Sequence, residues 1–175
     1  MALIGDYLLK EPIGNGSFSN VRLGEHRVCH TKVAIKIIPR NNFSDPEHLN
    51  RFHREVDLIK DLDHPLITEF FEVLEDDDNF YIIMEYVENG NMLDFVNNGG
   101  ALTEERARHF FCQIISVLDY LHTEKNIMHR DLKAENVLID RHDNIRLIDF
   151  GLSNMFSKEN PYLKTACGSP GMYFF

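Results

Sequence analysis

The chain has 175 residues, enough for one ordinary domain or two small lobes, and 43% of them are hydrophobic and 26% charged, which is typical of a soluble globular protein. Its formal net charge of -10 argues against nucleic acid or an anionic membrane as a general partner. Cys29, Cys112 and Cys167 are widely spaced, which predicts reduced thiols and neither a disulfide framework nor a zinc site. No apolar run is long enough to span a membrane and no basic stretch precedes the apolar N-terminal residues, so we expect a cytoplasmic protein, with the nucleus also compatible.

The first half of the chain is rich in short apolar runs separated by glycine-rich or acidic turns, a pattern that predicts β-strands. The predicted strands are Tyr7–Pro12, Val21–Glu25, Lys32–Ile38, Phe70–Leu74 and Phe80–Tyr86. Between the third and the fourth, Asp45 and Pro46 start a helix over 45–62, because apolar residues then recur at helical spacing. Residues 1–86 are therefore expected to form a five-stranded antiparallel sheet with one helix.

After Val87 the pattern changes to helices. A short helix is expected to run to about Asn98, and Thr103 caps a long helix with a broad apolar stripe. Two short strands, Val137–Ile139 and Ile145–Ile148, follow around a polar turn. Residues 87–175 thus form a second, mainly helical lobe, and the boundary lies near 86–90.

Two features of the first lobe suggest phosphate binding. The run Gly14-Asn15-Gly16-Ser17 lies between two strands, and its small residues let backbone N–H groups approach a phosphate closely. An ordinary hairpin turn explains the run equally well, and because a strand follows, a dinucleotide-binding βαβ unit fits poorly. Lys36, at the end of an apolar strand, could reach an anion or simply face water, and Glu55 on the next helix could orient it.

The most informative run is His129-Arg130-Asp131-Leu132-Lys133, followed by Asn136 and Asp149-Phe150-Gly151. It offers a base, a cation and two oxygen ligands for a metal ion within one short stretch. Phosphoryl transfer needs those parts, because the protein's contribution is positioning and charge neutralisation. The alternative is that Asp and Asn merely cap loops, and His129 is expected to be a packed structural residue.

Taken in order, these motifs resemble the eukaryotic protein Ser/Thr kinases from about Tyr7 to Pro170. The runs 149–155 and 163–170 resemble most closely the calmodulin-dependent and AMP-activated (Snf1-like) kinase branch. The resemblance implies an α+β protein-kinase-like fold: a β-rich N-lobe with one main helix, and the first part of a helical C-lobe. It also implies transfer of the γ-phosphoryl group of ATP to Ser/Thr hydroxyls of protein substrates.

The resemblance assigns roles residue by residue. Asp131 would accept or orient the proton of the substrate hydroxyl, and Lys133 would neutralise the transferred phosphoryl group. Asn136 and Asp149 would hold Mg²⁺, and the pair Lys36–Glu55 would orient the ATP phosphates. The implied nucleotide contacts are Ile13, Gly14, Asn15, Gly16, Ser17, Val21, Ala34, Lys36, Met84, Glu85, Val87, Asn91 and Leu138.

Within that set, Val21, Ala34 and Leu138 would sandwich the adenine and Met84 would guard the back pocket. Backbone groups of Glu85 and Val87 would bond the adenine edge, and Asn91 stands where many relatives have a ribose-binding glutamate.

Thr165 matches the activation-loop phosphosite, whose phosphate would pair with Arg130. Glu135 resembles the acid that binds basic residues in substrates, so the expected partners are a basic protein or peptide substrate and an upstream kinase or regulatory subunit.

Beyond Pro170 the sequence departs from the family pattern. Met172 stands in the place of a tyrosine, or one residue is inserted, and the Ala-Pro-Glu motif is missing. We therefore expect a truncated kinase whose long helix exposes Phe110, Phe111 or their neighbours. The alternative function is a catalytically inactive kinase acting as a nucleotide- or protein-binding module; a small-molecule phosphotransferase is a third reading.

Overall fold

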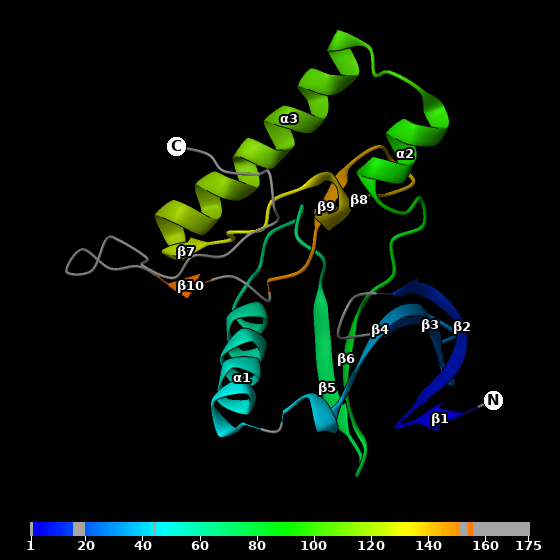
Figure 1. The fold of residues 1–175 in the computed structure, drawn as a ribbon. Coiled ribbons are helices and arrows are strands. Elements are labelled where there is room, and N and C mark those ends of the chain that lie inside the picture. The colour runs from blue at the N-terminus through cyan, green and yellow to red at the C-terminus, as the bar shows by residue number, and fades with distance from the viewer. Residues whose placement is uncertain (1, 16–19, 44, 151–153, 156–175) are drawn as a thin grey trace. The chain divides into compact units, whose positions relative to one another are not determined.

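The computed structural model describes residues 2–15, 20–43, 45–150 and 154–155 (Figure 1). The chain divides into two compact units, Met1–Val56 with Thr68–Tyr86, and Asp57–Ile67 with Val87–Phe175. The sequence placed 57–67 in the first lobe. In the structure this segment belongs to the second unit, because Leu58, Ile59, Leu62 and Leu66 pack on the core of that unit.

The first unit is built on an antiparallel sheet with strand order β1-β2-β3-β4-β6-β5. Its strands are β1 (Leu3–Ile4), β2 (Tyr7–Asn15), β3 (Asn20–His26), β4 (Lys32–Pro39), β5 (Phe70–Glu75) and β6 (Asn79–Glu85). The sheet has six strands and not the predicted five, because Leu3 and Ile4 pair with Leu8 and Tyr7. A two-residue strand carries no alternation that the sequence could reveal. The single turn η1 (Arg40–Asn42) follows β4.

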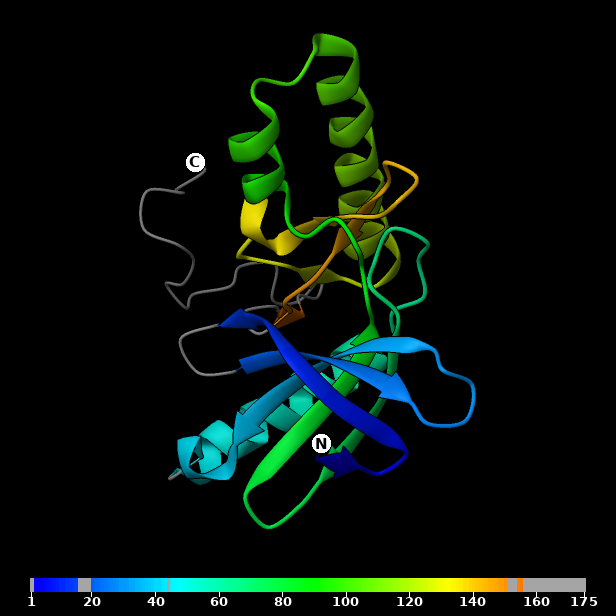
Figure 2. The same ribbon diagram turned by 90° about the vertical axis from the view of Figure 1, so that its right-hand side faces the viewer.

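Alternation along the strands gives this sheet two different faces. One face holds a core made of Tyr7, Leu9, Val33, Ile35, Tyr81 and Ile83. Helix α1 (Pro46–Lys60) lies along the other face, where Phe52 packs on Phe80 with ring centroids 4.7 Å apart (Figures 1 and 2).

Helix α1 is shorter than the predicted 45–62 at both ends. Asp45 stands outside it and accepts the Glu47 N–H at 2.8 Å. After Lys60, the N–H groups of Asp61 and Leu62 turn to the carbonyls of Leu58 and Ile59, three residues back.

The second unit contains α2 (Met92–Gly99) and α3 (Glu104–Asp119), followed by the π-helical turn η2 (Tyr120–Glu124). Thr103 caps α3 as predicted, since its hydroxyl accepts the Arg106 N–H at 3.3 Å. The remaining elements are β7 (Ile127–Met128), η3 (Ala134–Asn136), β8 (Val137–Ile139), β9 (Ile145–Leu147) and β10 (Asn154–Met155). Strands β8 and β9 form an antiparallel hairpin, and β7 pairs with β10.

The core of the second unit lies between α3 and the β8–β9 hairpin. Its most buried members are Phe110, Val117, Leu121, Ile139, Ile145 and Leu147. The expected exposure on α3 is found at Phe111 and Ile115, which are 62% and 47% exposed, but not at Phe110, which is 2% exposed because it faces this core. None of the described helices is long and apolar enough to span a membrane.

Replacing Gly24 with alanine should destabilise the first unit. A Cβ at Gly24 would lie 2.5 Å from Ile35 Cδ1 and 2.9 Å from Val33 Cγ2, and both side chains are buried in the core. Such overpacking costs about 1–3 kcal/mol. Urea unfolding of Gly24→Ala measures the loss, and Gly99→Ala is the matched control, because nothing lies within 4 Å of a Cβ there. Equal midpoints for the two variants would contradict the close packing at Gly24.

Candidate active site

One face of the sheet in the first unit brings together four of the predicted nucleotide contacts. Ala34 and Lys36 are two residues apart on β4 and therefore share a face. Val21 is the cross-strand partner of Lys36, and Met84 is the partner of Ala34. Ala34 is buried and Met84 half-buried, so this face offers an apolar surface with an ammonium group beside it.

Lys36 and Glu55 approach each other as predicted. Lys36 Nζ lies 3.9 Å from Glu55 Oε1, and the two side chains are 21% and 18% exposed. The distance is that of an ion pair and is longer than a hydrogen bond. Glu55 projects from α1, so the helix that packs on this face of the sheet also supplies the counter-charge for its lysine.

The predicted phosphate loop is described only in part. Gly14 and Asn15 end β2 and pair with Val21 and Asn20 of β3, so these two residues belong to the antiparallel ladder. Ile13 is exposed just before them. Gly16 and Ser17 lie outside the described residues.

In the second unit, three of the predicted catalytic and metal-binding residues meet at the Asp131 carboxylate. Its Oδ2 lies 3.0 Å from Lys133 Nζ and 3.1 Å from Asn136 Nδ2. Asn136 is buried, and its Nδ2 also donates to the Asp131 backbone carbonyl at 2.8 Å. The amide nitrogen of Asn136 therefore orients Asp131. The amide oxygen of Asn136, Oδ1, is the atom of its side chain that can accept or coordinate.

His129 supports this loop from within the core, in agreement with the structural role expected for it. The Asp131 N–H donates to His129 Nδ1 at 3.3 Å, and His129 Nε2 lies 3.0 Å from the Ile148 carbonyl. These contacts fit the neutral ring with its proton on Nε2. Burial lowers the pKa of His129, which favours the same neutral form. The ring also packs edge-on against Phe150 at 4.9 Å.

The backbone is left-handed at two non-glycine residues of the site. Arg130 has φ 64° and Asp149 has φ 65°. This region is sparsely populated by such residues and costs on the order of 1–3 kcal/mol at each position. The surrounding contacts must hold both residues there, which is common where a side chain has to be aimed at a ligand.

Asn136 and Asp149 are the candidate metal ligands, and a backbone bond joins the segments that carry them. The Ile148 N–H donates to the Asn136 carbonyl at 3.0 Å, immediately before Asp149. Among the described residues, no cluster of three His, Cys, Asp or Glu side chains could hold a metal ion. The amide oxygen and the carboxylate fit Mg²⁺, which commonly takes one or two protein oxygens and completes its shell with phosphate and water.

The remaining predicted contacts lie at the start of the second unit and on β8. Leu138 forms an isolated bridge with Asn91. The amide of Asn91 caps α2: Oδ1 accepts the Asp94 N–H, and Nδ2 donates to Asp94 Oδ2, each at 2.8 Å. The Glu85 N–H donates a hydrogen bond to the Glu69 carbonyl at 2.9 Å. The backbone group of Glu85 that can contact adenine is therefore its carbonyl. Thr165 lies outside the described residues.

The turn between β8 and β9 contains a buried carboxylate that the sequence did not single out as functional. Asp140 Oδ1 accepts the N–H groups of His142 and Asn144 at 2.8 and 2.9 Å. Burial by itself would raise the pKa of Asp140, but these two donors and the nearby Arg146 outweigh it and lower the pKa. The sequence signal that could have indicated this role is an Asp at the start of a polar turn with an Asn four residues later.

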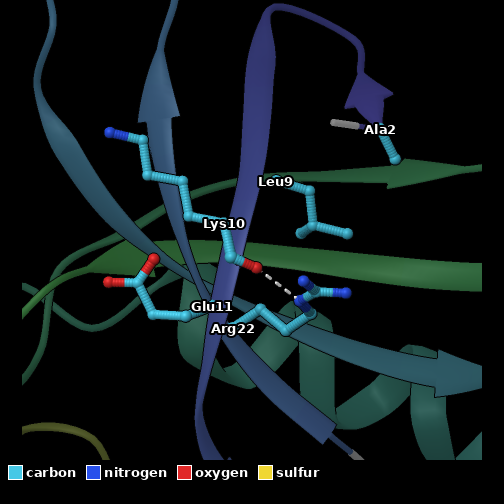
Figure 3. Close-up of a pocket in the computed structure, with 5 residues that line it drawn as sticks. All are labelled: Ala2, Leu9, Lys10, Glu11 and Arg22. Atoms are coloured by element: carbon cyan, nitrogen blue, oxygen red, sulfur yellow. Dashed lines mark hydrogen bonds between the residues drawn. The ribbon is translucent and has the colours of Figure 1, made fainter.

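A pocket of about 450 Å³ opens elsewhere on the first unit (Figure 3). Ala2, Leu9, Lys10, Glu11 and Arg22 line it, and Arg22 Nε donates to the Lys10 carbonyl at 2.6 Å. None of these residues is a predicted nucleotide contact, so the pocket is separate from the sheet face that carries Ala34, Lys36 and Met84.

Comparison with known proteins gives one family and several close relatives. Residues 7–173 match the family described as protein kinase domain. The chain is 49% identical over 168 residues to "Probable serine/threonine-protein kinase MARK-A" of Dictyostelium discoideum, covering 95% of this chain and 16% of that protein. It is 44% identical to "Serine/threonine-protein kinase SIK2" of Gallus gallus and 43% identical to "Serine/threonine-protein kinase SIK1" of Mus musculus, covering 95% of this chain and 21% of each relative.

Substituting Asp140 with asparagine should remove a pH-dependent part of the stability. The pKa of Asp140 is lower in the folded protein than its ordinary value of 3.8, so its contribution is present above about pH 4 and is lost as the pH falls through the folded pKa. At neutral pH we expect Asp140→Asn to cost about 1.5–3 kcal/mol, the range for hydrogen bonds to a charged group. Urea midpoints of both proteins between pH 7 and about pH 3 measure this, and a gap that stays constant would show that the charge is not responsible.

Proposed function

Because this chain belongs to the protein kinase family, we propose that it is an ATP- and Mg²⁺-dependent protein serine/threonine kinase. The observation that carries the proposal is the convergence of Lys133 and Asn136 on the Asp131 carboxylate, one backbone hydrogen bond away from Asp149. The relatives are named serine/threonine-protein kinases, as predicted from the motifs, and the chain spans 16–21% of their length. Their activity is therefore proposed for this chain.

In this proposal Asp131 meets the substrate hydroxyl. The bond from Asn136 Nδ2 and the Lys133 ammonium fix the orientation of its carboxylate, which can then accept or orient the hydroxyl proton. Lys133 neutralises negative charge on the transferred phosphoryl group. Positioning and charge neutralisation of this kind supply most of the protein's part in phosphoryl transfer.

Asn136 Oδ1 and the Asp149 carboxylate would hold Mg²⁺. When bound, the ion would offset the negative charge of the phosphates. The protein's own contribution is to hold the two oxygens at a fixed separation, through the Ile148 N–H bond to Asn136 and the left-handed backbone at Asp149.

The ligand-facing side of the sheet in the first unit is proposed to bind the nucleotide. Val21, Ala34 and Met84 supply apolar surface for the adenine ring, and Lys36, oriented by Glu55, meets the phosphates. Gly14, Asn15, Gly16 and Ser17 are proposed to cradle the phosphates, and Ile13, Glu85, Val87 and Leu138 to complete the adenine contacts. Asn91 caps α2 with its amide, and a ribose contact from this residue stays a prediction.

The proposed partners are basic protein substrates and an upstream kinase or regulatory subunit. Glu135 is exposed at the start of η3, four residues after Asp131, where it can meet a basic side chain near the target hydroxyl. The net charge of -10 favours the same class of substrate. Phosphorylated Thr165 would pair with the guanidinium group of Arg130, the residue directly before the proposed base Asp131.

Calorimetry of the chain with ATP and Mg²⁺ should show saturable binding that depends on Lys36. Lys36→Met removes the ammonium that meets the phosphates, and we expect affinity to fall by about 10- to 100-fold. Lys60→Met is the matched control, because Lys60 is an exposed lysine at the end of α1 and is not one of the proposed nucleotide contacts. Equal losses in the two variants would assign the effect to general charge and remove support for the proposed phosphate contact.

Phosphate transfer to a basic serine peptide should require Asp131. We expect Asp131→Asn to lower the transfer rate by at least about 100-fold, since it removes the proposed proton acceptor, while nucleotide affinity changes little. Asp119→Asn, an exposed acid at the end of α3, is the control. Transfer that survives both Asp131→Asn and Asp149→Asn would come from a contaminating kinase, and nucleotide binding without transfer would favour the binding-module alternative.

A further inference from the structure

We propose that Gln113 of α3 is a positioning residue for the two metal ligands Asn136 and Asp149, acting through the β8–β9 hairpin between them. The inference rests on the proposed nucleotide and Mg²⁺ binding. It concerns a residue that neither the motifs nor the family match assigns to the site.

The side chain of Gln113 holds the hairpin with both ends of its amide. Its Oε1 accepts the Ile145 N–H at 2.8 Å, and its Nε2 donates to Asn144 Oδ1 at 2.8 Å. Ile145 is the first residue of β9 and its side chain is fully buried. One glutamine thus fixes both the last residue of the turn and the first residue of the strand.

The hairpin needs such outside support because its strands are short. Strands β8 and β9 have three residues each, and an isolated two-stranded hairpin is marginal in water. The Ile139 N–H donates to the Gly90 carbonyl at 3.0 Å, and the Leu147 N–H to the Leu66 carbonyl at 2.9 Å. Gln113 completes this arrangement by binding the Ile145 N–H, so the outer edge of β9 is covered at both of its ends.

Two further side chains of α3 hold the same turn. Arg106 Nη2 lies 2.7 Å from each Asp143 carboxylate oxygen, and His109 Nε2 lies 2.9 Å from the Asp143 carbonyl. Arg106, His109 and Gln113 are three or four residues apart and therefore share one stripe of the helix. That stripe fixes the turn from Asp143 to Ile145, and Gln113 is the member that reaches the strand itself.

Gln113 can act on the metal ligands because the chain that connects them, residues 137–148, consists of the β8–β9 hairpin and Ile148. Asn136 directly precedes β8, and Asp149 follows β9 after Ile148. The Ile148 N–H closes the other end of the hairpin on the Asn136 carbonyl. A change in the register or tilt of β9 would therefore displace Asp149 relative to Asn136.

The test uses the complementarity of Gln113 and Asn144. Gln113→Glu keeps the acceptor for the Ile145 N–H, and Asn144 can turn its amide to donate to the new carboxylate. Asn144→Asp still accepts from Gln113 Nε2. Only the double variant Gln113→Glu/Asn144→Asp places two carboxylates where a 2.8 Å hydrogen bond now lies.

The readout is the gain in ATP affinity that Mg²⁺ provides, measured by calorimetry in Mg²⁺ and again in EDTA. We expect the single variants to keep this gain and the double variant to lose about tenfold of it, the lower end of the effect of groups that orient metal ligands. Affinity in EDTA should stay within about twofold of wild type in all variants, because Lys36, Val21, Ala34 and Met84 lie in the first unit, and Val87 and Leu138 are the proposed adenine contacts that lie in the second.

Each outcome separates the two ideas. If the wild-type chain shows no Mg²⁺-dependent ATP binding, the proposed function fails. If it does, and the double variant keeps the full gain, the positioning role is wrong. An equal loss in EDTA would also overturn it, since the effect would then be general. Should the double variant not fold, Gln113→Met removes both hydrogen bonds without adding charge and carries the same expectation.

Discussion

The hydrogen bond from the Ile148 N–H to the Asn136 carbonyl is the contact on which the proposed site in the second unit depends. It closes the β8–β9 hairpin next to both candidate metal ligands. His129 adds a second tie to the same point, because its ring contacts the Ile148 carbonyl and receives the Asp131 N–H. Three of the proposed site residues, Asp131, Asn136 and Asp149, are thereby tied to one short stretch of backbone.

In the first unit, a single sheet keeps the proposed binding surface on one face and a hydrophobic core on the other. Strand alternation does this without further elements. Ile35 and Ile83 point into the core, while Ala34, Lys36 and Met84 point to the opposite face. Helix α1 lies on that second face, so Glu55 meets Lys36 there, and the charge pair is assembled by packing of Phe52 on Phe80.

The sequence predicted what local pattern or motif order encodes: the strands around Lys36, the Thr103 cap, the helical α3 and the cluster at Asp131. It failed where distant parts decide. The segment 57–67 belongs to the second unit because its leucine and isoleucine side chains pack on a core that includes residues beyond 110. Gln113 looks like any polar helix residue until Asn144 and Ile145 are placed beside it, about thirty residues later in the chain.

The left-handed backbone at Asp149 shows how the fold supports a strained residue. Asp149 is exposed, yet it stands between two buried side chains: Leu147, two residues before it, lies in the core, and Phe150, directly after it, is buried against His129. Two apolar anchors flanking one exposed carboxylate leave the intervening backbone little freedom to relax to an extended conformation. The burial of a large apolar side chain is worth about 1.5–3 kcal/mol, comparable to the cost of the left-handed residue between them. The direction of the Asp149 side chain is therefore set by neighbours that have no proposed role in the chemistry. Gln113 is proposed to act in the same indirect way, by holding the hairpin.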